Sequence, residues 1–375
     1  MKNLLVGNGI NIQFDNESYT TQQIVLRALK NFERDDFPSH IIINYPYLMK
    51  NYFGKLYLEV REILKGNYDK YANCSAEKSS LSAFKEQYSS KLSTLRITDI
   101  GFEDYYLIHD LVCHKLGVVN PDQFYVREAM KTAYLFSIYN DGKLNLLHQN
   151  YSDSFKHYLN TFDNIFTTNY DSNIDSVVNK NVCHIHGHFE ELSDVYNTNS
   201  FRNKLPDTPI KEIEVDSNYY YLYSTAITTH CGDYKEIELK QSSSANKTVT
   251  NLANAYLNDP KIKIEIDKWI LDSNTITSNL GYAIQLKASH PDLSFTDHYH
   301  FERFRAIEGS LEILGLSPWN DFHIFEAINL SKIEGCIYYY YTKDQCSRIK
   351  ELLPNLIRDN IIVFKDTKEF WRTHQ

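Results

Sequence analysis

The sequence predicts an α/β fold built on a parallel sheet. Two observations lead to this prediction. Strand and helix patterns alternate near the end of the chain, with strands over 310–317, 337–341 and 360–364 and helices that begin at 320 and cover 343–353. Short buried strands that end in polar residues also occur at 3–6, 162–171 and 182–188. Alternation of this kind is typical of parallel sheets, because parallel strands need long crossover connections.

The first predicted strand, residues 3–6, leads directly into Gly-Asn-Gly-Ile-Asn at 7–11. Two glycines around a small polar residue allow a tight turn and a close approach of the backbone to a ligand. If a helix follows, its free N–H groups point towards phosphate. An ordinary strand-to-turn transition is the alternative interpretation of so short a motif.

Residues 21–140 show apolar residues at three- and four-residue spacing, which predicts helices. The predicted helices cover 22–32, 45–64, 80–92, 103–116 and 121–139. Asp104 and Asp122 stand where a cap or first-turn acid is expected. Since strands do not interrupt this stretch, we interpret it as a large helical insertion. A further helix over 151–159 leads into the next strand.

A second variable insertion is expected over 190–305. Residues 190–245 are polar and suggest a flap, and the tyrosines within 217–227 predict a strand or hairpin. Helices are expected over 245–257, 263–271 and 273–286. We therefore treat 1–375 as a single Rossmann-like α/β domain with two insertions.

Composition excludes several classes of protein. The net charge is −9, and clusters of Lys and Arg interleaved with aromatic residues are absent, which argues against a dedicated nucleic-acid surface. Apolar runs stay well below the roughly 18 residues of a membrane span, and the start lacks the features of a secretory signal. The six cysteines are scattered, as expected for reduced thiols in the cytoplasm.

Polar residues follow four of the predicted strands. These are Gly-Asn-Gly-Ile-Asn at 7–11, Thr-Thr-Asn-Tyr-Asp at 167–171, His-Ile-His-Gly-His at 184–188 and Gly-Leu-Ser-Pro-Trp-Asn-Asp at 315–321. In an open parallel sheet the carboxyl ends of the strands share one edge, where ligands bind. The four motifs therefore predict one pocket.

These motifs, in this order, resemble the sirtuin-like NAD-consuming superfamily, in particular its bacterial antiphage-defence branch and the AbiH-type abortive-infection proteins. Residues 7–11 stand where sirtuins have G-A-G-x-S and AbiH proteins have G-N-G-F-D. Residues 168–171 match the T-N-Y-D of the defence branch, whose asparagine is catalytic. His186 and Gly187 match the H-G pair whose histidine is the catalytic base. Residues 315–323 are similar to the late G-x-S…D-x-H-I element that closes the nucleotide site.

The resemblance implies an NAD glycohydrolase, which releases nicotinamide and ADP-ribose or a cyclic form. Asn169 would orient the ribose or the attacking water, His186 would be the base, and Asp171 would hold the carboxamide or stabilise the cationic transition state. The residues expected to bind NAD are Gly7, Asn8, Gly9, Asn11, Thr168, Gly315, Ser317 and Asp321. NAD is the expected substrate, and no metal is expected.

Two departures from the family pattern matter. The paired-cysteine zinc module of deacetylating sirtuins is missing, which argues against protein deacylation. Asn8 replaces the smaller alanine of the sirtuin loop. The resemblance also implies a cytoplasmic antiphage effector that depletes NAD, held inactive by an oligomer, a regulatory partner or a phage trigger.

Other interpretations stay open at this point. Asn169 could bond backbone groups at a strand end, His186 could be a buried core histidine, and Asp171 could cap a following helix. The pocket could bind NAD or ADP-ribose without hydrolysis, as a sensor in a defence complex. His184, His186 and His188 would face the same way on a strand, which would suit a metal-dependent nuclease-type toxin.

Overall fold

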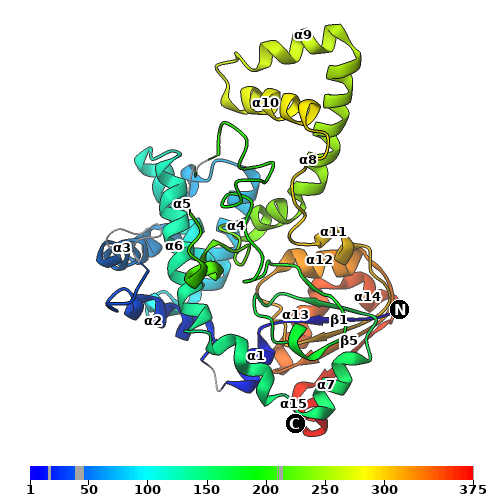
Figure 1. Ribbon diagram of the computed structural model, residues 1–375. Helices are drawn as coiled ribbons and strands as arrows, with labels where there is room; N and C mark the ends of the chain where they lie inside the picture. Colours follow the sequence, from blue (N-terminus) through cyan, green and yellow to red (C-terminus); the bar gives the residue numbers. More distant parts are fainter. Residues whose placement is uncertain (16–17, 39–45, 209, 211–213, 375) are drawn as a thin grey trace.

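The computed structural model describes the chain except residues 16–17, 39–45, 209, 211–213 and 375 (Figure 1). Its sheet has six strands in the order β3-β2-β1-β4-β5-β6, and every adjacent pair is parallel. The strands are β1 Lys2–Val6, β2 Asn164–Thr167, β3 Val182–His184, β4 Glu308–Leu314, β5 Lys332–Tyr340 and β6 Ile362–Asp366. The predicted Rossmann-like parallel sheet is thus confirmed.

The strand order reverses between β1 and β4. From β1 the chain proceeds outwards through β2 to β3, then returns to β4 on the other side of β1 and continues to β6. Ligands of open α/β sheets bind outside the carboxyl ends of the strands at such a reversal. Val6 pairs with both Thr167 and Leu314, so the loops after β1, β2 and β4 start at the same level.

Helices cover both faces of the sheet. Because successive strand residues face opposite sides, Leu4 and Val6 pack in one apolar cluster and Leu5 in another. The first face is covered by α1 Gly9–Phe14, α7 Asp153–Asn160 and α15 Thr367–His374. The second face is covered by α11 Phe301–Arg305, α12 Phe322–Leu330, α13 Lys343–Leu352 and α14 Pro354–Arg358.

The connection from β1 to β2 contains a helical unit with its own apolar core. Its α-helices are α2 Thr21–Asn31, α3 Pro46–Leu64, α4 Ser75–Tyr88, α5 Asp104–Leu116 and α6 Asp122–Tyr139. Short 3-10 helices accompany them: η1 Asp69–Tyr71, η2 Ser89–Lys91, η3 Ile97–Asp99 and η4 Lys143–Asn150. Asp104 and Asp122 are first-turn acids, as expected.

The helix predicted over 80–92 has different bounds in the structure, Ser75–Tyr88. Tyr45, the predicted start of one helix, lies outside the described residues. The helix expected over 80–92 begins five residues earlier, at Ser75. The Cys74 sulfur accepts a hydrogen bond from Glu77 N and caps this helix. Cysteine is not among the residues that usually cap helices, so the sequence does not mark the N-terminus of this helix with a capping residue.

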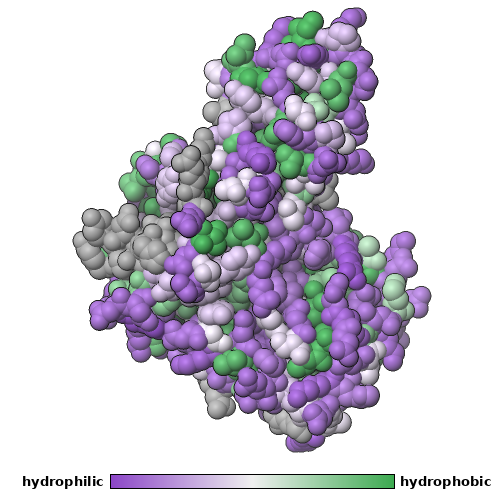
Figure 2. Space-filling model, in the orientation of Figure 1, coloured by the Kyte–Doolittle hydropathy of each residue, from purple (hydrophilic) through white to green (hydrophobic). Residues whose placement is uncertain are grey.

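Part of the connection from β3 to β4 forms an elongated arm (Figure 1). The arm consists of α8 Gly232–Asn258, α9 Pro260–Trp269 and α10 Thr275–Ser289. In Figure 2 it projects from the body with hydrophilic and hydrophobic residues mixed on its surface. Helix α8 begins within the segment expected to be a polar flap. No helix of the described residues is both long and apolar enough to cross a membrane.

The strand or hairpin expected over 217–227 is wrong. The chain forms a 3-10 helix, η6 Ser217–Tyr223, which begins where the Asp216 carboxylate accepts a bond from Asn218 N. Tyr221 stacks on Tyr139 of α6, with ring centroids 3.9 Å apart. Packing against α6, rather than the β-propensity of the tyrosines, therefore decides the conformation of this segment.

Candidate functional site

The loops after β1 and β4 pack backbone against backbone. Gly7 N donates to Leu314 O over 2.9 Å, and Gly9 N donates to Gly315 O over 2.8 Å. A Cβ on Gly7 would lie 2.5 Å from Gly315 O, and one on Gly9 would lie 2.7 Å from Gly315 Cα. Contact between the two loops therefore requires these glycines, and two N–H groups of the first loop are already satisfied within the protein.

A cavity of about 510 Å³ lies at the carboxyl edge of the sheet. This volume is within the range of small-molecule sites. The sequence-predicted residues that line it are Asn8, Asn11, Thr168, Asn169, Asp171, His186 and Asp321. Helices α4 and α5 and the first turn of α8 close it from the side opposite the sheet. The two insertions thus contribute walls to the same cavity.

Four predicted NAD-binding residues are not part of this lining: Gly7, Gly9, Gly315 and Ser317. The glycines lie in the contact between the two loops. The Ser317 hydroxyl accepts a bond of 3.4 Å from Trp319 N, and Trp319 itself lines the cavity. Ser317 therefore shapes the turn that presents this indole.

Asn169 is buried at the end of β2, and its backbone is fully engaged. Its N–H donates to Thr167 Oγ1 over 3.0 Å, and its carbonyl oxygen lies 2.9 Å from His184 Nδ1. Within the described part of the chain, no group bonds its side-chain amide. The amide is therefore not a backbone cap, and it is available to a ligand in the cavity.

The buried His186 and His323 form a cluster with the partly buried Asp321. The Nε2 atoms of His186 and His323 are 3.1 Å apart, so one ring donates and the other accepts. His186 Nε2 also lies 3.7 Å from Asp321 Oδ1. Burial lowers the pKa of His186 well below its usual value and that of His323 to about 3. Both imidazoles are therefore neutral at pH 7.

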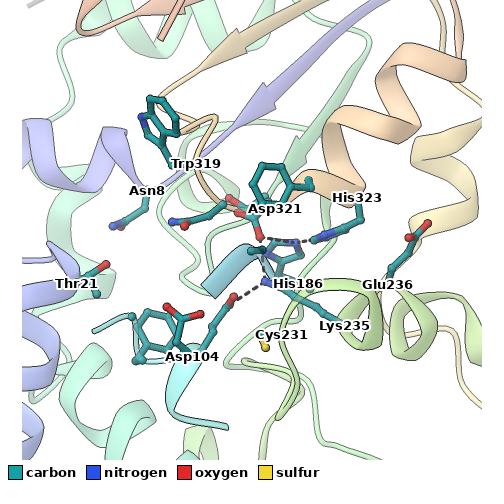
Figure 3. A pocket seen from close by; sticks show the side chains of 18 of the residues that line it. Asn8, Thr21, Asp104, His186, Cys231, Lys235, Glu236, Trp319, Asp321 and His323 are labelled. Carbon is teal, nitrogen blue, oxygen red and sulfur yellow. Dashed lines mark hydrogen bonds and ion pairs between the residues drawn. The ribbon is translucent and has the colours of Figure 1, made fainter. Parts of the chain in front are cut away.

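A buried lysine that the sequence analysis did not identify completes the cluster (Figure 3). Lys235 Nζ lies 2.8 Å from Glu103 Oε1 and 3.0 Å from Asp321 Oδ1. Burial alone would raise the pKa of Asp321, but the Lys235 ammonium holds it well below its usual range. Local sequence offers no signal for this contact, because the three residues lie in three distant segments.

Asp321 adopts a left-handed backbone conformation, with φ 55° and ψ 42°. This region is uncommon for residues other than glycine, and such strain is concentrated at functional sites. The residue immediately precedes α12, which carries His323. The conformation places the Asp321 carboxylate beside Lys235 and His186.

Asp171 lies at the cavity but is held by neighbours. Asn11 Nδ2 donates to it over 2.7 Å, Asn173 Nδ2 over 2.6 Å and Asn173 N over 3.1 Å. Burial raises the pKa of the carboxyl. The proposed helix cap is wrong, because an Asx-type turn follows, and the next helix is the short 3-10 helix η5 Asp175–Val177.

The expectation that three histidines face the same way is wrong. Strand β3 ends at His184, and the chain turns at Gly187, whose φ is +89°. His184 and His188 stack at 4.0 Å, and His184 Nε2 lies 3.1 Å from Asp175 Oδ2. His186 instead joins His323 on the cavity side. A strand alternation cannot be extended beyond the last paired residue.

Among the residues that the structure describes, two groups have ligand atoms close enough to hold a metal: Asp175 with His184 and His188, and His186 with Asp321 and His323. Neither geometry is favourable as it stands. The rings of His184 and His188 are inclined by 23° and stacked, so their in-plane lone pairs do not converge. In the second group the Asp321 carboxylate already forms an ion pair with the Lys235 ammonium, which would compete with a metal ion.

Comparisons with known proteins give no family for this chain: no family model, no curated protein and no solved structure matches it.

Proposed function

We propose that this protein is an NAD glycohydrolase that cleaves the bond between nicotinamide and ribose. The observation that carries the proposal is the pairing of Asn169 and His186 at one cavity. The Asn169 amide lines the cavity without a bonding partner among the described residues, and His186 lines it as a neutral imidazole. The sheet reverses at this point, which is where α/β proteins bind nucleotides.

The residues support a division of roles. Cleavage of the glycosidic bond by water yields nicotinamide, ADP-ribose and one proton. Asn169 would bond the ribose hydroxyls or the attacking water through its amide. His186 would accept the proton from that water, because its ring is neutral at pH 7. Asp171, held by Asn11 and Asn173, would fix the loop that carries Asn169.

The test is NAD consumption by the purified protein beside Asn169→Ala and His186→Ala, with the products separated by chromatography. We expect nicotinamide release by the wild type, reduced by about 100-fold or more in both variants. His157→Ala is the matched control, since His157 is exposed on α7 and does not line the cavity. Absence of both turnover and NAD binding in the wild type would reject the proposal.

A binding module is the second candidate, and one observation favours it. The His186 Nε2 atom already pairs with His323 Nε2, so its lone pair or proton is engaged before any ligand arrives. A sensor of NAD or ADP-ribose would use the same cavity without turnover. An NAD-dependent rise in melting temperature, with no nicotinamide released, would identify this function.

We further propose that the enzyme acts in the cytoplasm as an antiphage effector that depletes NAD. The order of its strand-end motifs, which resembles the defence branch, supports this role. Such an activity must be restrained, so an oligomer, a regulatory partner or a phage trigger is implied. Expression of wild type and Asn169→Ala in bacteria, followed by measurement of cellular NAD during phage infection, tests the role.

A further inference from the structure

Helix α8 belongs to both the cavity and the arm. Its first turn supplies Gly232, Lys235 and Glu236 to the cavity lining. Its C-terminal half contributes Val249 and Ala253 to the apolar clusters of the arm. The helix has 27 residues, which corresponds to roughly 40 Å at 1.5 Å per residue.

Lys235 is 2% exposed, an uncommon environment for a lysine. Its ammonium group lies between Glu103, which immediately precedes α5 of the helical insertion, and Asp321 of the loop after β4. One side chain thus joins the first insertion, the second insertion and the sheet edge (Figure 3).

We propose that Lys235 is a positioning residue for the proposed reaction, because it holds Asp321 in the geometry that aligns His323 and His186. This inference rests on the proposed function and assigns a role to the second insertion within that site. The lysine contacts the carboxylates rather than the reacting atoms, so its effect is transmitted through Asp321.

Removal of the ammonium group would leave two partly buried carboxylates facing one position. Isolated buried charges are strongly disfavoured, so Glu103 or Asp321 would take up a proton or move towards water. Asp321 holds a strained left-handed conformation that its bond to Lys235 helps to maintain. Because Asp321 leads directly into α12, its movement would displace His323 from its 3.1 Å contact with His186.

Three variants test this role: Lys235→Met, Lys235→Arg and the control Lys247→Met. Lys247 is exposed on the same helix, so its loss leaves the cluster intact. For Lys235→Met we expect kcat for nicotinamide release to fall by about 100-fold, as for a small misplacement of catalytic groups. KM should rise by a smaller factor than kcat falls, because Lys235 is 2% exposed and pairs with the two carboxylates. Lys235→Arg retains the charge and should recover at least about 10-fold of the loss.

A second readout does not depend on activity. Titration of the histidine rings by NMR reports whether His186 and His323 stay neutral and paired. In wild type and Lys247→Met, both rings should remain neutral between pH 8 and about 5.5. In Lys235→Met, at least one ring should shift or become protonated in this range. If Lys235→Met does not fold, Lys235→Gln replaces it, because an amide can donate to one carboxylate without a charge.

Unchanged histidine signals in a folded Lys235→Met or Lys235→Gln protein would overturn the inference, whatever the activity. A kcat within about 3-fold of wild type in an active protein would also overturn it. Failure of the proposed function has a different signature, namely no nicotinamide release by the wild type. The NMR titration still decides the positioning role in that case.

Discussion

The Asn11 side-chain amide donates a hydrogen bond of 2.7 Å to Asp171 Oδ2, and both side chains are buried. The two residues are 160 positions apart. The bond ties α1, which follows β1, to the loop after β2, and therefore holds two strand-end motifs at one edge of the sheet.

Replacement of Asn11 by Asp should destabilise the protein in a pH-dependent way. Two carboxylates in contact raise the pKa of the pair above the unfolded value near 4. The repulsion is present above that raised pKa and disappears as the pH falls through it. We expect a loss of about 2–3 kcal/mol at pH 8 and a smaller loss at pH 5. Urea unfolding at both values measures this; Asn11→Leu, which adds no charge, should show a weaker pH dependence.

Substitution of a glycine at the contact between the loops after β1 and β4 should lower the stability of the folded protein. A Cβ on Gly7 would meet Gly315 O at 2.5 Å, so Gly7→Ala should lower the free energy of unfolding by about 1–3 kcal/mol. Gly54 has no heavy atom within 4 Å of its added Cβ and lies inside α3. Gly54→Ala should therefore raise stability by about 0.5–1 kcal/mol. Equal stability of the two variants would contradict the loop contact.

Histidine burial in the helical insertion should make the protein sensitive to acid. His109 is 1% exposed, and burial lowers its pKa to about 4. The unfolded chain binds a proton below about pH 6.5, whereas the folded chain does so only below about pH 4. The stability linked to this ring is complete above pH 6.5 and is lost as the pH falls towards 4.

A His109→Gln variant isolates that contribution. Between pH 7.5 and pH 5, its free energy of unfolding should fall by about 2 kcal/mol less than that of the wild type. Urea titrations at the two pH values provide the comparison. Equal declines would show that His109 can be protonated in the folded state at pH 5. The quantity compared is the change in the free energy of unfolding between the two pH values.

The charge of the cavity should favour NAD over NADP. Its described lining contains one lysine, Lys235, and these acidic residues: Glu103, Asp104, Asp171, Glu236, Asp321, Glu326 and Glu351. The extra phosphate of NADP adds nearly two negative charges, which this lining would repel. We expect kcat/KM for NADP to be at least about 10-fold lower than for NAD. The gap should narrow at high salt, and equal use of both dinucleotides would contradict it.

Local patterns in the sequence were sufficient to predict the parallel sheet and some of the residues that line the cavity. The strands after 160 were predicted because short apolar segments end at polar residues, and this contrast reflects burial of both faces of a parallel strand. Asn169, His186 and Asp321 were predicted to share a pocket, and all three line one cavity. The carboxyl ends of parallel strands necessarily share an edge, so this prediction needs no knowledge of the loops.

Outside the strands, the local sequence pattern predicted the wrong conformation for two segments. Residues 217–227 have the tyrosine-rich composition of a strand, yet packing on α6 makes part of them helical. The alternation through His184, His186 and His188 fails once β3 ends, because Gly187 turns the chain. In both cases a local period was extended into a segment whose backbone is set by distant contacts.

The sequence by itself therefore determined the sheet, the strand-end motifs and the edge at which they meet, because these depend on periodicity and on the geometry of parallel strands. Only the tertiary structure decided that Lys235 and Glu103 join Asp321, and that Gly7 and Gly9 serve the contact with Gly315. Those contacts connect residues in distant segments. Their formation depends on how two insertions fold over the sheet, which short-range patterns do not encode.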